Sequence, residues 1–272
     1  MTDPSPTPDE HDDKSRIKED RHFVSALARG LEVLTCFRDA GMLLGNQEIA
    51  ERSRLPKSTV SRLTYTLTKL GYLDPVEGMA KYRLGTAAVV LGASALTNFD
   101  IRRVAVPLMQ ELADFARASV SLGVRERLAV VYIDTQRGAA TFSLNVDAGW
   151  RVPIATTAIG RAYIASCGEA ERAYLLDALR EDDPAAWPQR RAGIEAAIQQ
   201  FREIGCCTSF GEWQSEVNSI ATTISRGPER QPMVINCGGP AFMLTPAFLV
   251  DTVRPRLIEV ARSIQASAMR MP

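Results

Sequence analysis

The chain of 272 residues is long enough for two domains, and its 46% hydrophobic and 24% charged residues are ordinary for a soluble globular protein. Its formal net charge is zero, and no run approaches the roughly 18 consecutive apolar residues that a membrane helix needs. The two histidines, His11 and His22, leave residues 23–272 without an imidazole, which excludes a Ser-His-Asp nucleophile and a histidine-ligated metal from that part of the chain.

Residues 1–20 predict a disordered acidic tail. Seven acidic and three basic residues give this segment a net charge of −4, and it has almost no apolar side chain to bury. A segment of this kind differs from a basic, apolar export signal, so we expect a cytoplasmic protein without membrane contact. Residues 21–84 carry ten basic and six acidic residues, a net charge of +4, which is compatible with a surface that contacts phosphates.

The next elements follow the order of a winged helix-turn-helix over residues 21–84. A first helix begins near Phe23 and ends near Gly41, with one apolar stripe. A short helix over 46–53, with Asn46 as a candidate N-cap, is interrupted at Pro56, and a second helix over 57–70 is closed by Gly71. Stretches 71–74 and 81–84 predict a hairpin, and an Ala-rich helix over 85–99 predicts a linker or dimerisation helix. The apolar stripe of the first helix consists of Val24, Leu27, Leu31, Leu34 and Phe37. The expected buried face of the helix over 57–70 consists of Val60, Leu63, Leu67 and Leu70.

The helix over 57–70 is the predicted DNA-reading element. Ile49, Leu55 and Val60 supply apolar contacts between the two helices, so the start of the second helix projects polar side chains into the major groove. At a helix N-terminus, side chains and amides can contact phosphate, and an arginine one turn later can reach a guanine edge or a phosphate. The candidate DNA-binding residues are Lys57, Ser58, Thr59, Ser61, Arg62 and Tyr65 on the helix, with Lys81 and Arg83 on the wing.

From residue 100 onward the pattern alternates between helices and strands and predicts an α/β domain over 100–272. Helices are expected over 101–117, 158–166, 169–180, 187–204 and 246–269. Strands are expected over 119–125, 128–134, 206–210, 217–224 and 232–237, with further extended pieces around 141–145 and 150–153.

Three segments resemble the DNA-binding domain of the IclR family of bacterial transcription regulators. They are the stretch from Glu48 through Leu-Pro-Lys-Ser-Thr-Val to Arg62, the Leu-Gly-Tyr-Leu of 70–73, and the Tyr-Arg-Leu-Gly of 82–85. The resemblance covers residues 22–98. It implies dimers, or dimers of dimers, on palindromic operators, with the Ala-rich helix taking part in dimerisation.

The rest of the chain is similar to the effector domain of that family, which the resemblance implies is a curved antiparallel sheet with helices and a ligand in its cavity. The segments 158–165, 211–224 and 237–241 carry this likeness. Gly238 stands where the family commonly has a hydroxyl residue, and Ser209 stands where an acid can occur. The resemblance implies a small-molecule effector, a carboxylate or aromatic acid, bound by Leu144, Ala158, Ile159, Gly160, Ser209, Ser219, Asn236 and Gly238.

Two other interpretations remain open at this point. In one, residues 100–272 are a catalytic domain with a DNA-binding appendage, and in the other the winged helix is a protein-interaction module. For a regulator, Arg62→Ala should abolish DNA binding while the fold survives, whereas both alternatives predict little effect of this substitution on function. The adjacent Cys206 and Cys207 suggest redox chemistry, but the five cysteines contain no CxxC pair, which favours a structural role. We therefore expect a ligand-responsive transcription regulator that is not an enzyme and holds no metal or cofactor.

Overall fold

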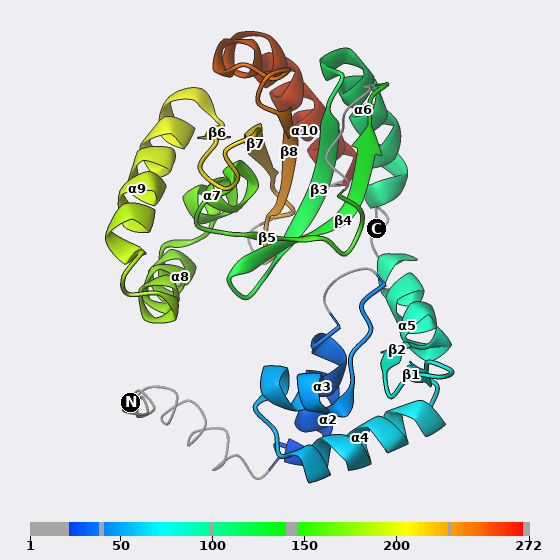
Figure 1. Cartoon of the computed structure of the whole chain (residues 1–272). Coiled ribbons are helices and arrows are strands. Elements are labelled where there is room, and N and C mark those ends of the chain that lie inside the picture. Colours follow the sequence, from blue (N-terminus) through cyan, green and yellow to red (C-terminus); the bar gives the residue numbers. More distant parts are fainter. Residues whose placement is uncertain (1–21, 38–40, 98–100, 140–145, 228–229, 269–272) are drawn as a thin grey trace. The chain divides into compact units, whose positions relative to one another are not determined.

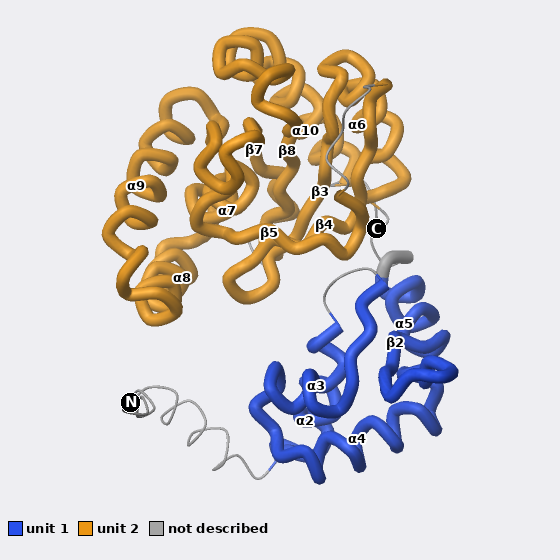
Figure 2. The backbone as a smooth tube through the Cα atoms, viewed as in Figure 1, with its two compact units in different colours: residues 1–96 blue, residues 97–272 orange. Residues whose placement is uncertain are grey.

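The computed structural model describes residues 22–37, 41–97, 101–139, 146–227 and 230–268. The chain divides into two compact units, residues 1–96 and 97–272, coloured blue and orange in Figure 2. In the described ranges, no helix is long and apolar enough to cross a membrane. The predicted tail over 1–20 and the predicted extended piece around 141–145 lie outside these residues.

The first unit is a helix-turn-helix with a β-hairpin, as predicted (Figure 1). Its helices are α2 (Ser25–Thr35), α3 (Asn46–Ser53) and α4 (Lys57–Lys69), and its hairpin pairs β1 (Leu73–Pro75) with β2 (Tyr82–Leu84) in antiparallel register. An isolated bridge between Leu44 and Tyr82 ties the hairpin to the segment before α3. Helix α5 (Thr86–Thr97) follows the hairpin.

The turn between α3 and α4 arises from two local constraints. Arg54 adopts a left-handed backbone conformation with φ 54°, which ends α3. Pro56 then precedes the first residue of α4, where its missing N–H costs no helical hydrogen bond. Ile49 and Val60 are fully buried across this turn, so the angle between the two helices is set by a packed core.

Two details of the first unit differ from the prediction. Helix α2 ends at Thr35 instead of near Gly41. The N-cap of α3 is Gly45, because Glu48 returns to its backbone N–H at 2.7 Å in a capping box. Asn46 is instead the first helical residue, and its Oδ1 accepts a hydrogen bond from the Thr64 hydroxyl at 3.0 Å.

The predicted apolar stripe of α2 is only partly buried. Val33 and Phe37 enter the core, whereas Val24 and Leu27 are about three-fifths exposed, at 62% and 61%. Leu70, expected on the buried face of α4, is 60% exposed because the helix ends there and the chain turns away at Gly71. The helical periodicity of the sequence correctly predicts an apolar face on each of these helices, but it does not show whether the same unit buries that face.

The second unit is built on a curled six-stranded antiparallel sheet, as predicted. The strand order is β5-β4-β3-β8-β7-β6, in which β3 spans Ser119–Glu126, β4 Ala129–Arg137, β5 Arg151–Pro153, β6 Cys207–Phe210, β7 Val217–Ile224 and β8 Met233–Pro240. The helices of this unit are α6 (Ile101–Ala116), α7 (Ala158–Ser166), α8 (Glu169–Asp182), α9 (Trp187–Ile204) and α10 (Arg254–Ala268), with a π-helix η1 (Phe248–Val253) before α10.

The helices cover both faces of this sheet (Figure 1). Helices α6 and α10 pack on one face, and α7 packs on the other with α8 and α9 beside it. On the α7 side, Ile159 and Tyr163 are buried against Val130 and Val234. Because successive side chains of a strand point to opposite faces of the sheet, each central strand contributes one set of side chains to the α7 side and the alternate set to the side of α6 and α10.

The last helix was predicted over 246–269, and the chain is helical from residue 246 to Ala268, but six of these residues form the π-helix η1. The N–H of Arg254 donates to the carbonyl of Leu249, five residues back, which is the hydrogen bond of a π-helix. Pro255 follows, and because it has no N–H it cannot bond the carbonyl four residues before it. The widened turn accommodates the proline, and the ordinary helix continues to Ala268.

Candidate functional site

Helix α4 presents one polar face to solvent. Val60, Thr64 and Leu67 are buried against the rest of the unit, which turns the other side of the helix outward. Of the predicted DNA-binding residues on α4, Thr59 is half-buried, and the exposed ones are Lys57, Ser58, Ser61, Arg62 and Tyr65. The structure thus brings these predicted residues together on one accessible surface.

The cations of this face differ in how they are held. The Lys57 ammonium donates to Gln47 Oε1 at 3.3 Å, and Lys69 lies 5.6 Å from the ring centroid of Tyr65. Arg62 makes no side-chain hydrogen bond or ion pair with the described residues, and on the hairpin Arg83 is exposed as well. An unpaired guanidinium one turn into the helix keeps all five of its donors for an external acceptor.

Lys81 was predicted to contact DNA from the wing, but in the structure its ammonium faces the protein. It lies 3.2 Å from the Glu48 carboxylate and 3.5 Å from the Leu43 carbonyl. The N–H of Gly45, and then Lys81, hold the pKa of Glu48 below its ordinary value. Lys81 therefore links the hairpin to the start of α3, and its ion pair with Glu48 weakens the attraction of its ammonium for an external phosphate.

The predicted effector residues of the sheet form a continuous polar strip on its α7 side. In the strand register, Ser209 lies opposite Ser219, Ser219 opposite Gly238, and Gly238 opposite Ser119. Asn236 lies two residues from Gly238 on the same face of β8. The chain therefore collects hydroxyl and amide groups from four neighbouring strands, and the family resemblance had indicated all of them except Ser119.

The start of α7 lies against this strip. The Ser209 hydroxyl donates to the Thr156 carbonyl at 2.8 Å, and Thr157 caps the helix by accepting from the N–H of Gly160 at 3.2 Å. The amides of Ala158 and Ile159 donate to no acceptor among the described residues. The donors of Ser209 and Gly160, which were predicted to bind ligand, are thus used within the protein, and Leu144 lies outside the described residues.

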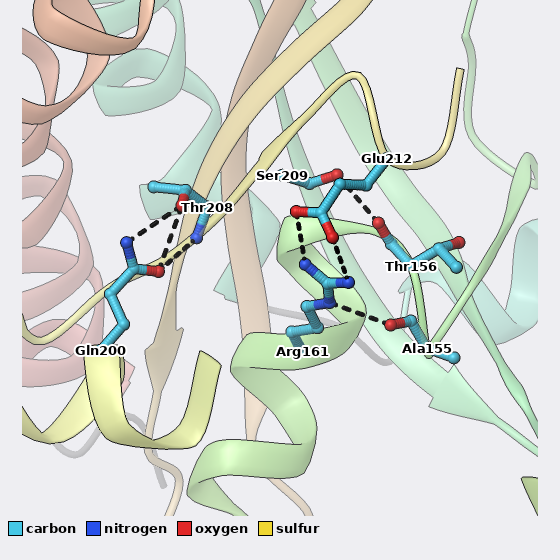
Figure 3. A network of polar contacts seen from close by, with 7 residues as sticks. All are labelled: Ala155, Thr156, Arg161, Gln200, Thr208, Ser209 and Glu212. Carbon is cyan, nitrogen blue, oxygen red and sulfur yellow. Dashed lines mark hydrogen bonds and ion pairs between the residues drawn. The ribbon is translucent and has the colours of Figure 1, made fainter. Parts of the chain in front are cut away.

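An ion pair between a buried arginine and a partly exposed glutamate, not predicted from the sequence, fixes the segment before α7 (Figure 3). The guanidinium of Arg161 donates to both carboxylate oxygens of Glu212, at 2.7 and 2.6 Å, and its Nε donates to the Ala155 carbonyl at 2.9 Å. The Arg161 side chain is 6% exposed and that of Glu212 46%. The pair lines a cavity of about 210 Å³ with Gly193, Ala196, Ala197, Gln200 and Thr208.

The signal for this pair in the sequence was weak. Arg161 is the one charged residue in the otherwise small and apolar segment 158–165, which indicates a buried cation that needs a partner. Its partner is 51 residues away, and no local pattern connects the two. Gly193 on α9 is part of the same arrangement, because a Cβ there would overlap the Arg161 guanidinium.

The surroundings of the cysteines favour the structural role expected from the sequence. All five are buried and none forms a disulfide among the described residues, and burial raises the pKa of Cys167 to about 11 and the pKa values of Cys206, Cys207 and Cys237 to about 12. A thiol with a raised pKa is mostly protonated at neutral pH and reacts slowly, because the thiolate is the nucleophile.

Iodoacetamide at pH 8 is expected to leave these four thiols unmodified in the native protein and to label all five cysteines in denaturant. A shift of two units lowers the thiolate fraction about a hundredfold. Intact-mass spectrometry counts the labels, with an unfolded sample at the same pH as the control. Rapid native labelling at Cys206 or Cys207, or a disulfide between them, would contradict the structural assignment.

Comparison with known families decides the class of protein. The model described as the IclR helix-turn-helix domain matches residues 26–77, and the model described as bacterial transcriptional regulator IclR C-terminal matches residues 93–266. The chain belongs to the IclR family of bacterial transcriptional regulators. As a family member it is a DNA-binding regulator with a C-terminal effector domain, and the family is one of regulators, not of enzymes.

Three relatives illustrate the family likeness. The chain is 34% identical over 246 residues to the HTH-type transcriptional regulator TsaQ1/TsaQ2 of Comamonas testosteroni, covering 90% of this chain and 88% of that one. It is 44% identical to an IclR family regulator from Brucella abortus whose crystal structure is known, with a TM-score of 0.84 and coverage of 94% and 95%. It shares the fold of an IclR homologue from Microbacterium hydrocarbonoxydans, crystallised with 4-hydroxybenzoate, at 21% identity, a TM-score of 0.71 and coverage of 90% and 99%.

Proposed function

We propose that the chain reads palindromic operator DNA with α4 and changes its affinity for that DNA when a small organic acid binds the second unit. The observation that carries the first half is the exposed polar face of α4, with Arg62 unpaired among the described residues. Arg62 reads a guanine edge or a phosphate, and the start of the helix contacts phosphates. Because operator DNA lies in the bacterial cytoplasm, the protein works there. The remaining contacts of this proposal come from Lys57, Ser58, Thr59, Ser61, Tyr65 and Arg83, with a smaller contribution from Lys81.

The proposed palindrome requires two copies of the reading unit. The apolar side chains that α2 and α5 leave exposed support such a homodimer, because a second copy of the same surface can cover them. Val24 just before α2 and Leu27 and Leu31 on it are 52–62% exposed, and Val89 and Val90 on α5 are 65% and 59% exposed. A dimer spaces its two reading helices about one helical turn of DNA apart. Dimers of dimers use the same pair contact.

The proposed effector lies along the polar strip and the start of α7. The amides of Ala158 and Ile159 supply two donors at the positive end of a helix, which favours a carboxylate. Ser219 and Asn236 supply further polar groups, and Ile159 supplies an apolar wall. The ligand changes operator affinity to the extent that it binds the two arrangements of the dimer unequally.

Fluorescence anisotropy on a duplex from the region upstream of the chain's own gene tests the DNA-reading half. The full chain is expected to bind this duplex more tightly than a scrambled one, and raised salt is expected to weaken binding steeply through counterion release. Arg62→Ala is expected to weaken operator binding by about tenfold or more, the equivalent of about 1–3 kcal/mol for a base contact. Lys81→Ala is expected to have a smaller effect, because its charge already faces Glu48.

Arg103→Ala is the matched control, since Arg103 is an exposed arginine on α6 in the second unit. It is expected to leave operator binding unchanged. Equal effects of Arg62→Ala and Arg103→Ala, or equal binding of operator and scrambled duplexes by the wild type across the promoter fragments tested, would count against α4 as the reading element and favour the interaction-module interpretation.

A further inference from the structure

Two buried polar atoms on the α7 side of the sheet have no hydrogen-bond partner among the described residues. They are the Ser119 hydroxyl on β3 and the Asn236 Oδ1 on β8. Ser119 is 3% exposed and Asn236 7%. Buried polar groups are nearly always paired, because an unpaired one loses its hydrogen bonds to water and gains nothing. Two such atoms on one face of neighbouring strands indicate that a missing group belongs between them.

The register brings these two residues close together. Asn236 pairs with Ser121, and Ser119 lies two residues along β3, opposite Gly238. Gly238, between these two residues, has no side chain. Ser219 and Asn236 border its position closely, because a Cβ on residue 238 would lie 3.0 Å from the Cβ of Ser219 and 3.6 Å from Asn236 Nδ2. The neighbouring Ser121 hydroxyl, by contrast, is paired with Thr135 at 3.0 Å. The unmet hydrogen-bonding capacity is therefore confined to the two positions beside Gly238.

The two atoms specify the chemistry of the missing group. The Asn236 side chain is hydrogen-bonded to the phenol of Tyr132, whose pKa burial raises to about 12, so this neighbour stays neutral. Oδ1 is an acceptor only and needs a donor, whereas the Ser119 hydroxyl can donate or accept. A hydroxyl group satisfies both atoms at once, by donating to Asn236 and accepting from Ser119. An ammonium group has no lone pair for Ser119, and an apolar group satisfies neither atom.

We propose that the effector is a hydroxylated carboxylic acid, whose hydroxyl binds between Ser119 and Asn236 while its carboxylate takes the amides at the start of α7. The proposal rests on the effector role proposed above and adds the specificity determinants Ser119 and Asn236. A site built to bind a hydroxyl discriminates strongly against the analogue that lacks it, because its own polar groups are then left unpaired.

Isothermal titration of the full chain with matched acids tests the proposal. The probes are 4-hydroxybenzoate against benzoate, and lactate against propionate. In at least one pair, the hydroxylated acid is expected to bind about tenfold tighter or more than its partner. Ser119→Ala and Asn236→Leu are expected to reduce this preference to near unity.

The stability of the free protein separates recognition from structure. Ser119→Ala removes a buried hydroxyl that has no partner, so the free variant is expected to unfold at the same temperature as the wild type or a higher one. Ser121→Ala is the matched control, a buried serine on the same face of the same strand. It breaks a satisfied hydrogen bond with Thr135, so it is expected to lower the unfolding temperature and to keep the preference for the hydroxylated acid.

The outcomes are distinguishable. Equal affinities for the two members of each pair, or a preference that survives Ser119→Ala and Asn236→Leu, would overturn the proposal and assign the place to an internal water, while acid sensing stands. Failure of all four acids to bind would overturn both this proposal and acid sensing. The DNA-reading proposal is unaffected in either case, because anisotropy on the operator tests it without a ligand.

Discussion

Gly160→Ala is expected to destabilise the second unit by about 3 kcal/mol or more, the upper end of what overpacking costs. Gly160 lies in the first turn of α7, and a Cβ there would overlap the Cα and the carbonyl oxygen of Ile154 and lie 2.6 Å from its carbonyl carbon. Ile154 is fully buried, and its backbone cannot move without disturbing the strand and turn before α7. The helix propensity gained with alanine, about 1 kcal/mol, does not offset this overlap.

Gly193→Ala is the matched control. Gly193 is also helical and in the second unit, but the added Cβ would meet the end of the Arg161 side chain, 3.2 Å from Cζ, instead of a buried backbone. A side-chain end can shift, so a loss below about 2 kcal/mol is expected once the gain in helix propensity is included. The two variants differ in what the same methyl group meets.

Denaturant unfolding followed by tryptophan fluorescence measures both variants. The three tryptophans, Trp150, Trp187 and Trp213, all lie in the second unit, so the signal reports on this unit alone. The result also bears on the effector proposal, because it assigns Gly160 a packing role beside the amides that are proposed to bind the ligand. Equal losses of unfolding free energy in Gly160→Ala and Gly193→Ala would contradict the explanation that Gly160 is needed for the close approach of α7 to the Ile154 backbone.

The reading unit could be predicted closely because its signals are local. Pro56 marks the start of α4 and Gly71 lies just beyond its end, through backbone constraints that hold in any fold, and the alternation of buried and exposed positions on α4 follows from the helical period alone. The exposure of Leu27 could not be predicted in the same way. Periodicity shows that an apolar face exists, while what covers it depends on partners that the sequence of one chain does not display.

The polar strip was predicted in part, from the family resemblance and not from physical reasoning about the residues. Ser219 and Asn236 were identified, but their neighbour Ser119 depends on the pairing of β3 with β8, which joins strands more than a hundred residues apart. The internal hydrogen bond of Ser209 could not be predicted for a related reason. Its hydroxyl donates to the carbonyl of Thr156, a contact fixed by tertiary structure.

Glu212→Ala is expected to destabilise the second unit by about 2–3 kcal/mol, more than Arg161→Met does. Removing Glu212 leaves a guanidinium that is 6% exposed and has, among the described residues, only the Ala155 carbonyl as acceptor. Breaking a fully buried pair in this way costs about 3–5 kcal/mol. The smaller value applies because Glu212 is 46% exposed and water can enter where it stood. In Arg161→Met, by contrast, the carboxylate that remains can be hydrated.

The double variant Arg161→Met/Glu212→Ala is expected to be no less stable than Arg161→Met alone. Once the buried cation is gone, its counter-ion has no further role, so the two substitutions are strongly non-additive in a double-mutant cycle followed by tryptophan fluorescence. Additive losses would show that Glu212 stabilises its own loop and not the guanidinium.

The ion pair is linked to the proposed ligand site by a further hydrogen bond of Arg161. Its Nε donates to the Ala155 carbonyl, and the residues that follow Ala155 lead to the helix start where the effector carboxylate is proposed to bind. Arg161→Met is therefore expected to weaken acid binding even at temperatures where the unit remains fully folded, and an unchanged affinity would confine the ion pair to a purely structural role.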